Sequence, residues 1–166
     1  MRPAAALLPL LILLPATLNA QVGGSTPKPD PRVAAALKSI GVDSDVDDDG
    51  DYKLTLRVDE DGERTQIVYV ISSTERYGNL EIREIWAPAF KTGGRLDDDV
   101  AREMLVANER MKLGAWRLYG DDDDQMAVYA VQIDADANAE AMRSALQIVV
   151  QVADAEEKEQ TGKDDY

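Results

Sequence analysis

Residues 52–71, YKLTLRVDEDGERTQIVYVI, decide the fold of this chain. From residue 52 to residue 58, apolar side chains alternate with Lys, Thr and Arg, which is the period of a strand with one face in water. Residues 59–62 combine acidic residues with a glycine and are typical of a turn. A continuous apolar run follows at residues 67–71. The segment therefore predicts an antiparallel β-hairpin.

Turn and cap signals divide the remainder of the chain into further elements. A helix is expected over residues 31–40, because Asp30 can cap its first turn, Pro31 fits the first helical position and Gly41 ends the apolar repeat. The other expected elements are a strand at 80–86, a helix that begins at Asp97 or Asp98, a hairpin made of 113–119 and 126–133, and a last helix capped by Asn138. The order αβββαββα predicts an α+β fold, with a largely antiparallel sheet packed against helices.

The two ends of the chain differ in composition from this body. Residues 1–20 have a positive start, a short apolar stretch and a small residue at Ala20, which are the parts of a secretory signal peptide. A membrane-spanning helix needs about 20 predominantly apolar residues, and Pro9 and Pro15 interrupt this stretch. We therefore expect a periplasmic or secreted protein, with a flexible linker at 21–30, one domain at 31–158 and a polar tail at 159–166. The chain is expected to fray from about Glu156 onward.

The charge balance restricts the partners and the chemistry. The chain has 18 basic and 32 acidic residues, no histidine and no cysteine. Removal of the leader takes away Arg2 and leaves 17 basic residues against 32 acidic ones, a formal charge of −15. Such a body repels nucleic acid and anionic membranes. Histidine or cysteine catalysis and His/Cys metal sites are excluded, so neither an enzyme nor a cofactor is expected.

Several short segments resemble the YbjN-like family of bacterial sensory transduction regulators. They are the helix end at 37–41, LKSIG, the acidic turn before Tyr52, Asn108, the segment LGAWRL at 113–118, and the pair Ala153-Asp154. The resemblance covers about residues 31–158. It implies a fold like that of type III secretion chaperones, and a non-enzymatic, often dimeric, chaperone-like or regulatory module that binds a polypeptide.

Asp45-Val46-Asp47-Asp48-Asp49-Gly50 matches the first half of a DxDxDG calcium loop. The second half does not match, because Lys53 stands at the ninth position and Leu56 at the twelfth, where a bidentate Glu belongs. Two interpretations stay open. Asp45, Asp47 and Asp49 bind Ca²⁺ weakly in an acidic cation-binding protein, or the segment is a solvated loop in which Gly50 adopts a left-handed conformation.

Aromatic residues supply the other candidate site. Trp86, Trp116, Tyr119 and Tyr129 are candidates for partner binding, although core packing is the alternative for each of them. Glu84, within the expected third strand, is the acid best placed to be screened from water. Its position on a solvent-facing strand explains it equally well, so we expect no carboxylate hydrolase.

Two expectations concern larger surfaces. Val100, Ala101, Met104, Leu105 and Ala107 are expected to share one face of the middle helix. Because its apolar surface exceeds a single stripe, we expect a homodimer through this helix or the strand that follows it. The acidic segments 59–61, 97–99 and 121–124 are expected at one end of the sheet.

Overall fold

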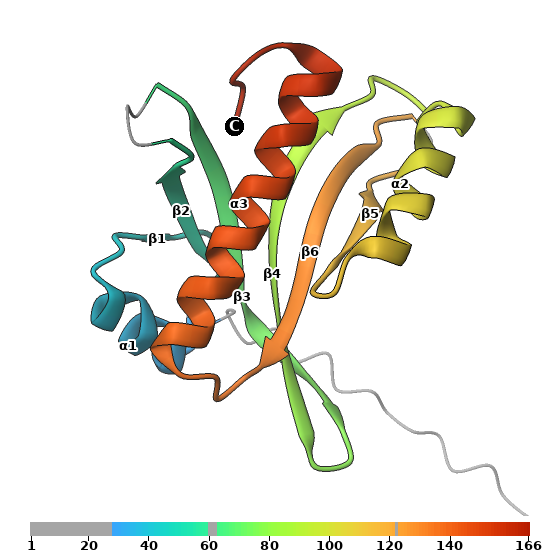
Figure 1. Ribbon diagram of the computed structural model, residues 1–166. Helices are drawn as coiled ribbons and strands as arrows, with labels where there is room; N and C mark the ends of the chain where they lie inside the picture. Colours follow the sequence, from blue (N-terminus) through green and yellow to red (C-terminus); the bar gives the residue numbers. More distant parts are fainter. Residues whose placement is uncertain (1–27, 60–62, 122) are drawn as a thin grey trace, which may run out of the picture.

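The computed structural model describes residues 28–59, 63–121 and 123–166, and the expected leader lies outside this part of the chain (Figure 1). The elements in chain order are α1 (Pro31–Ile40), β1 (Asp45–Val46), β2 (Tyr52–Arg57), β3 (Thr65–Tyr77), β4 (Leu80–Lys91), α2 (Asp98–Arg110), β5 (Ala115–Tyr119), β6 (Met126–Asp134) and α3 (Ala139–Thr161). The α+β class is confirmed. The two-residue strand β1, inside the acidic segment, is an addition to the predicted order.

The six strands form one antiparallel sheet in the order β1-β2-β3-β4-β6-β5. The predicted hairpin is present as β2 and β3, in which Leu54 lies opposite Val68. The register between β3 and β4 shifts between Val70 and Thr74, so β3 contains an irregularity there. Strands β1 and β5 are the two edges of the sheet.

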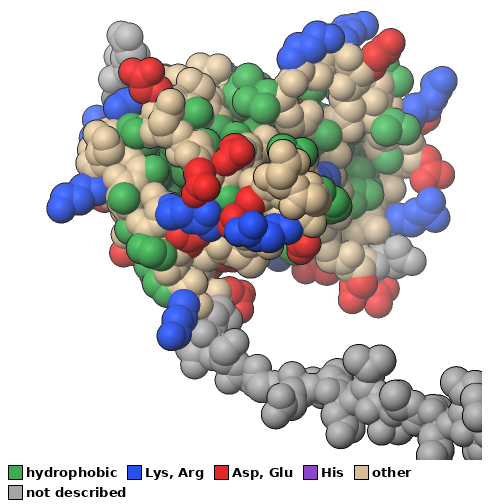
Figure 2. All heavy atoms as spheres, turned by 90° about the horizontal axis from the view of Figure 1, so that it is seen from below, with side chains coloured by type: hydrophobic (Ala, Val, Ile, Leu, Met, Phe, Trp, Pro, Cys, Tyr) green, Lys and Arg blue, Asp and Glu red, His purple; other side chains and the backbone are tan. Residues whose placement is uncertain are grey.

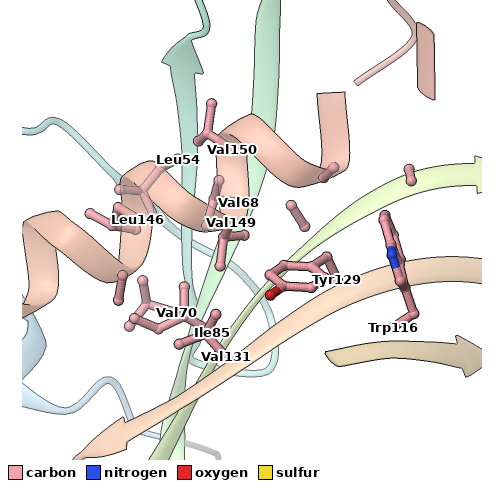
Figure 3. Packing of buried hydrophobic residues seen from close by; sticks show 14 of the residues in the cluster. Leu54, Val68, Val70, Ile85, Trp116, Tyr129, Val131, Leu146, Val149 and Val150 are labelled. Carbon is pink, nitrogen blue, oxygen red and sulfur yellow. The ribbon is translucent and has the colours of Figure 1, made fainter. Parts of the chain in front are cut away.

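The helices lie on one face of the sheet, and no helix of the described residues lies on the other (Figure 1). Helix α3 contacts β3, β4 and β6, α1 packs on α3, and α2 contacts β5. The core between these layers contains Leu54, Val68, Val70, Ile85, Tyr129, Val131, Leu146, Val149 and Val150 (Figure 3). The fold therefore has two layers and leaves one broad sheet face without a helical cover.

The helix starts follow the local signals in the sequence. The side chains of Asp30, Asp97 and Asn138 each accept a hydrogen bond from a backbone N–H of the first turn of their helix. The expected buried face of α2 is only partly correct. Met104 is buried, but Leu105 is 70% exposed, because α2 covers the margin of the sheet and buries a narrow stripe.

The end of the chain does not fray as expected. Helix α3 continues to Thr161, and its polar residues Asp154 and Glu157 are buried. Arg64 donates to Asp154 at 2.6 Å, so an ion pair fixes the last turns of the helix against the start of β3. No helix in the described ranges combines the length and apolarity needed to cross a bilayer.

Candidate functional site

The candidate site is the sheet face that points away from α3, called the open face below. Strand register places its side chains in rows, because residues paired across antiparallel strands share a face. One row contains Lys53, Tyr69, Trp86, Ala130 and Ala115. Others on this face include Ile67, Ile71, Ile82, Glu84, Arg117, Tyr119, Val128 and Gln132. The middle of the open face is thus apolar and aromatic, whereas Lys53, Thr55 and Arg57 of β2 make its margin polar.

Three rings form a stack at its centre. The Tyr69 and Trp86 ring centroids are 4.4 Å apart, those of Trp86 and Tyr119 are 5.5 Å apart, and both pairs have interplanar angles of 20°. Tyr69 comes from β3 and Tyr119 from β5, which lie on opposite sides of β4. Both faces of the Trp86 indole are therefore covered by tyrosines. We call these three residues the aromatic ladder.

An ion pair and a hollow adjoin the aromatic ladder. Arg117 of β5 pairs with Glu84 of β4 across the intervening strand β6. The Gln132 amide donates to the same carboxylate at 3.4 Å. Beside this pair is a hollow of about 340 Å³, lined by Ile71, Ser73, Glu75, Tyr77, Ile82, Glu84 and Gln132. The open face therefore combines the aromatic ladder with an adjacent concave surface of mixed polarity.

The structure divides the four aromatic residues predicted to bind a partner. Trp86 and Tyr119 lie on the open face, and Tyr119 is 53% exposed. Trp116 and Tyr129 face the helices and pack edge to face in the core, with centroids 5.2 Å apart (Figure 3). For these two residues the structure shows the alternative, packing in the core. Burial also raises the pKa of Tyr129, whose hydroxyl donates to the Leu113 carbonyl.

Tyr69 is the site residue that the sequence analysis missed. It stands in the continuous apolar run of β3, where no alternation marks one face as exposed. Its position directly opposite Trp86 follows from the register of β3 and β4. A correct pairing of these two strands would have identified it.

The DxDxDG segment forms a hairpin turn. Asp45 pairs with Lys53 as part of β1, and the Asp47 carboxylate accepts from the N–H groups of Asp49 and Asp51 at 3.0 and 2.9 Å. Gly50 has a φ of 79°, the left-handed conformation expected for a turn. Asp45, Asp47 and Asp49 therefore do not converge as a calcium loop requires.

Across the described residues, the one set of three or more acids close enough to share an ion is Asp154, Glu157 and Asp164. Arg64 already lies among them, with its guanidinium nitrogens 2.6, 3.5 and 3.9 Å from the three carboxylates. The guanidinium supplies the positive charge that a metal would bring. This cluster is a structural ion pair network.

In comparisons with known proteins, no family model, no curated protein and no solved structure matches the chain. The YbjN-like resemblance and its chaperone-like fold therefore stay predictions. The open face is therefore the feature of the structure that bears on function. Its central feature is the aromatic ladder of Tyr69, Trp86 and Tyr119.

Proposed function

We propose that this chain is an exported, non-enzymatic module of the YbjN-like kind that binds a polypeptide, as a chaperone-like or regulatory protein. The observation that carries the proposal is the aromatic ladder on a sheet face without a helical cover. Large apolar patches on a protein surface mark interaction sites. Aromatic residues are also enriched among those that contribute most to protein–protein binding.

The ladder geometry favours a polypeptide over a flat ligand. A sugar or a nucleobase binds by stacking on an open ring face, but both faces of Trp86 are covered by Tyr69 and Tyr119. Of the three rings, Tyr119 is the exposed one, at 53%. Apolar side chains of a polypeptide can pack against it, and Arg117 and Glu84 beside the aromatic ladder offer polar contacts at its margin.

Charge makes other partner classes less suitable. The formal charge of −14 opposes binding to phosphate backbones and anionic lipid. The alternative of an acidic calcium-binding protein has less support, because Asp45, Asp47 and Asp49 do not converge and Arg64 occupies the acidic cluster. We therefore assign the partner as a polypeptide with an apolar segment.

The test compares two single charges introduced at exposed apolar residues on opposite faces. Tyr119→Asp alters the open face, whereas Leu105→Asp alters α2 on the helical face, and the two parent side chains are 53% and 70% exposed. Each variant and the parent are immobilised and used to capture polypeptides from a periplasmic extract. Captured polypeptides are then titrated individually against the three proteins.

We expect a polypeptide that binds the parent and Leu105→Asp equally, and that binds Tyr119→Asp about 30-fold more weakly, since a central interface residue contributes about 2 kcal/mol. Equal binding by Tyr119→Asp would place the partner on another surface. Weaker binding by Leu105→Asp alone would assign the site to the helical face.

A further inference from the structure

The last residues of the chain bind to the start of β3. Helix α3 ends at Thr161, and its C-cap Gly162, with a φ of 66°, turns the chain back. Residues 163–166, called the strap below, then lie beside the end of the sheet where β3 begins (Figure 1). Arg64 donates to the Lys163 carbonyl at 2.8 Å. The strap is therefore an ordered segment that returns to a strand distant in sequence.

Main-chain groups of β3 supply two further contacts. The Thr65 N–H donates to the Asp164 carboxylate at 3.3 Å, and the Ile67 N–H donates to the Tyr166 carbonyl at 3.2 Å. A carbonyl that accepts from a strand N–H is the contact that a neighbouring strand would make. The Tyr166 carbonyl of the strap thus makes the contact with β3 that an added strand would make.

Strand β4 does not pair with the first residues of β3. Pairing of β3 with β4 extends to Tyr69 opposite Trp86, and two residues further along β4 is Pro88, which has no N–H to donate. The Pro88 carbonyl accepts a hydrogen bond from the side-chain amide of Gln66 at 2.8 Å. The Thr65 and Ile67 N–H groups are therefore not paired with β4 and donate to the strap instead.

A buried carboxylate completes the site from the helix side. Glu157 of α3 is fully buried, and its Oε1 accepts from the Asp165 N–H at 2.6 Å. Of the four hydrogen bonds that join the strap to residues 64–67 and Glu157, those at Lys163, Asp165 and Tyr166 use main-chain atoms of the strap. Asp164 contributes its side chain, which also lies 3.9 Å from the Arg64 guanidinium. These contacts match an extended backbone with one acidic side chain.

We propose that residues 64–67 and Glu157 form a second peptide-binding site, which the strap occupies in cis and which an extended segment of a partner with an acidic side chain at the position of Asp164 can occupy instead. This site is separate from the aromatic ladder and does not depend on it. Binding in trans competes with the strap, so the strap lowers the apparent affinity for a partner.

The experiment uses a fluorescent peptide with the sequence QTGKDDY, residues 160–166, and two charge-matched variants of the full chain. Asp164→Lys removes the side-chain contacts to Thr65 and Arg64. Asp165→Lys removes only an exposed ion pair with Lys163 inside the strap and keeps the main-chain contact to Glu157. A third protein ends at Gly162 and has no strap. Circular dichroism checks that each variant is folded.

We expect Asp164→Lys and the shortened protein to bind the peptide about tenfold more tightly than the parent, because the competing strap is loosened or absent. Asp165→Lys is expected to bind it as the parent does. A peptide carrying Lys in place of its first Asp should bind none of the proteins. If the folded Asp164→Lys protein binds the parent peptide no more tightly than the parent protein does, the strap is not a displaceable ligand and the proposal is wrong.

Discussion

At the scale of single residues, a buried ion pair joins α1 to the hairpin of β3 and β4. Arg83 is fully buried on the helical side of β4, and it pairs with Asp30 at 2.5 Å. Its guanidinium also donates to the carbonyls of Ile71 and Ser72 at 2.6 and 3.1 Å, within the irregular part of β3. Because Ser73 follows directly and lines the hollow, this buried pair helps to shape the open face from the opposite side.

Asp30→Asn tests the charge of this pair while keeping a good helix cap. The substitution leaves the Arg83 guanidinium buried without a counter-charge, so we expect a loss of about 3–5 kcal/mol of unfolding free energy at pH 7. The measurement is urea denaturation. Asp136→Asn is the control, because this exposed partner of Arg32 should contribute less than about 1 kcal/mol.

The effect of Asp30→Asn should also depend on pH. Burial alone would raise the pKa of Asp30, but hydrogen bonds from Arg32 and Arg83 outweigh it and hold the pKa well below the ordinary 3.8. A depressed pKa stabilises the fold fully above 3.8, and this stability is lost as the pH falls below that value. The difference between parent and variant should therefore shrink in acid. A difference that stays constant from pH 7 to about pH 2.5 would contradict this assignment.

At the scale of elements, both edges of the sheet are protected against pairing with another chain. Strand β1 has two residues. The outer side of β5 is closed at Trp116, whose N–H donates to the Asn108 side-chain oxygen at 2.7 Å and whose carbonyl accepts from the Asn108 amide at 3.4 Å. The Asn108 side chain of α2 thus makes the hydrogen bonds that a neighbouring strand would make. The homodimer stays a prediction, and it would have to use the exposed Leu105 and Val106 of α2 more than β5.

Asn108→Ala should release the edge of β5. Loss of both hydrogen bonds leaves two main-chain groups of Trp116 unpaired, so we expect a decrease of about 1–3 kcal/mol in unfolding free energy. The freed edge should also increase the mass measured by light scattering as the protein concentration rises. Asn108→Asp, which keeps the acceptor for the Trp116 N–H, should show a smaller effect. An unchanged stability and mass for Asn108→Ala would mean that this amide does not protect the edge.

Local signals predicted the elements, and long-range pairing decided their faces. Asp30 and Asn138 were recognisable as caps, because capping involves residues two or three positions apart. The burial of Glu157 could not be predicted, since its partner Arg64 is 93 positions away. Alternation along β5 implies that Trp116 and Tyr119 lie on opposite faces. Which face the helices cover is decided by the assembled sheet. The sequence therefore predicted two of the three residues of the aromatic ladder, Trp86 and Tyr119, and missed Tyr69.

At the scale of the whole molecule, the two ends of the sheet differ in how their charges are balanced. At the end with the β3–β4 hairpin, basic and acidic side chains lie side by side (Figure 2), including the pairs Arg32–Glu81 and Arg76–Glu81. The opposite end contains the acidic segments that the sequence analysis placed together. Antiparallel order brings Asp59, residues 97–99 and the β5–β6 turn to this end, as expected (Figure 1). Residues 60–62 and 122 of these segments lie outside the described residues.

The excess of acid at this end should make the fold more stable when charges are screened. Lys91 and Arg95 each form one exposed ion pair there, at 3.5 Å with Asp124 and 3.0 Å with Asp98, and exposed pairs contribute little. We therefore expect the melting temperature to rise with sodium chloride at neutral pH. Calcium and magnesium should raise it further and to similar extents, because solvated carboxylates provide charge without the fixed oxygen cage of a selective calcium site.

Replacement of Asp121, Asp123 and Asp124 by Asn should raise the melting temperature in low salt and make it depend less on sodium chloride. The reason is that the substitution removes three negative charges from an end of the sheet where acidic side chains repel one another. The matched control converts three exposed acids away from this end, Asp43, Asp48 and Glu75, to amides. This control changes the net charge by the same amount. A larger effect of the Asp121, Asp123 and Asp124 variant therefore comes from where its charges lie in the fold. A parent melting temperature that is indifferent to salt, or one that drops in the Asp121, Asp123 and Asp124 variant, would show that these carboxylates make specific contacts instead of repelling one another.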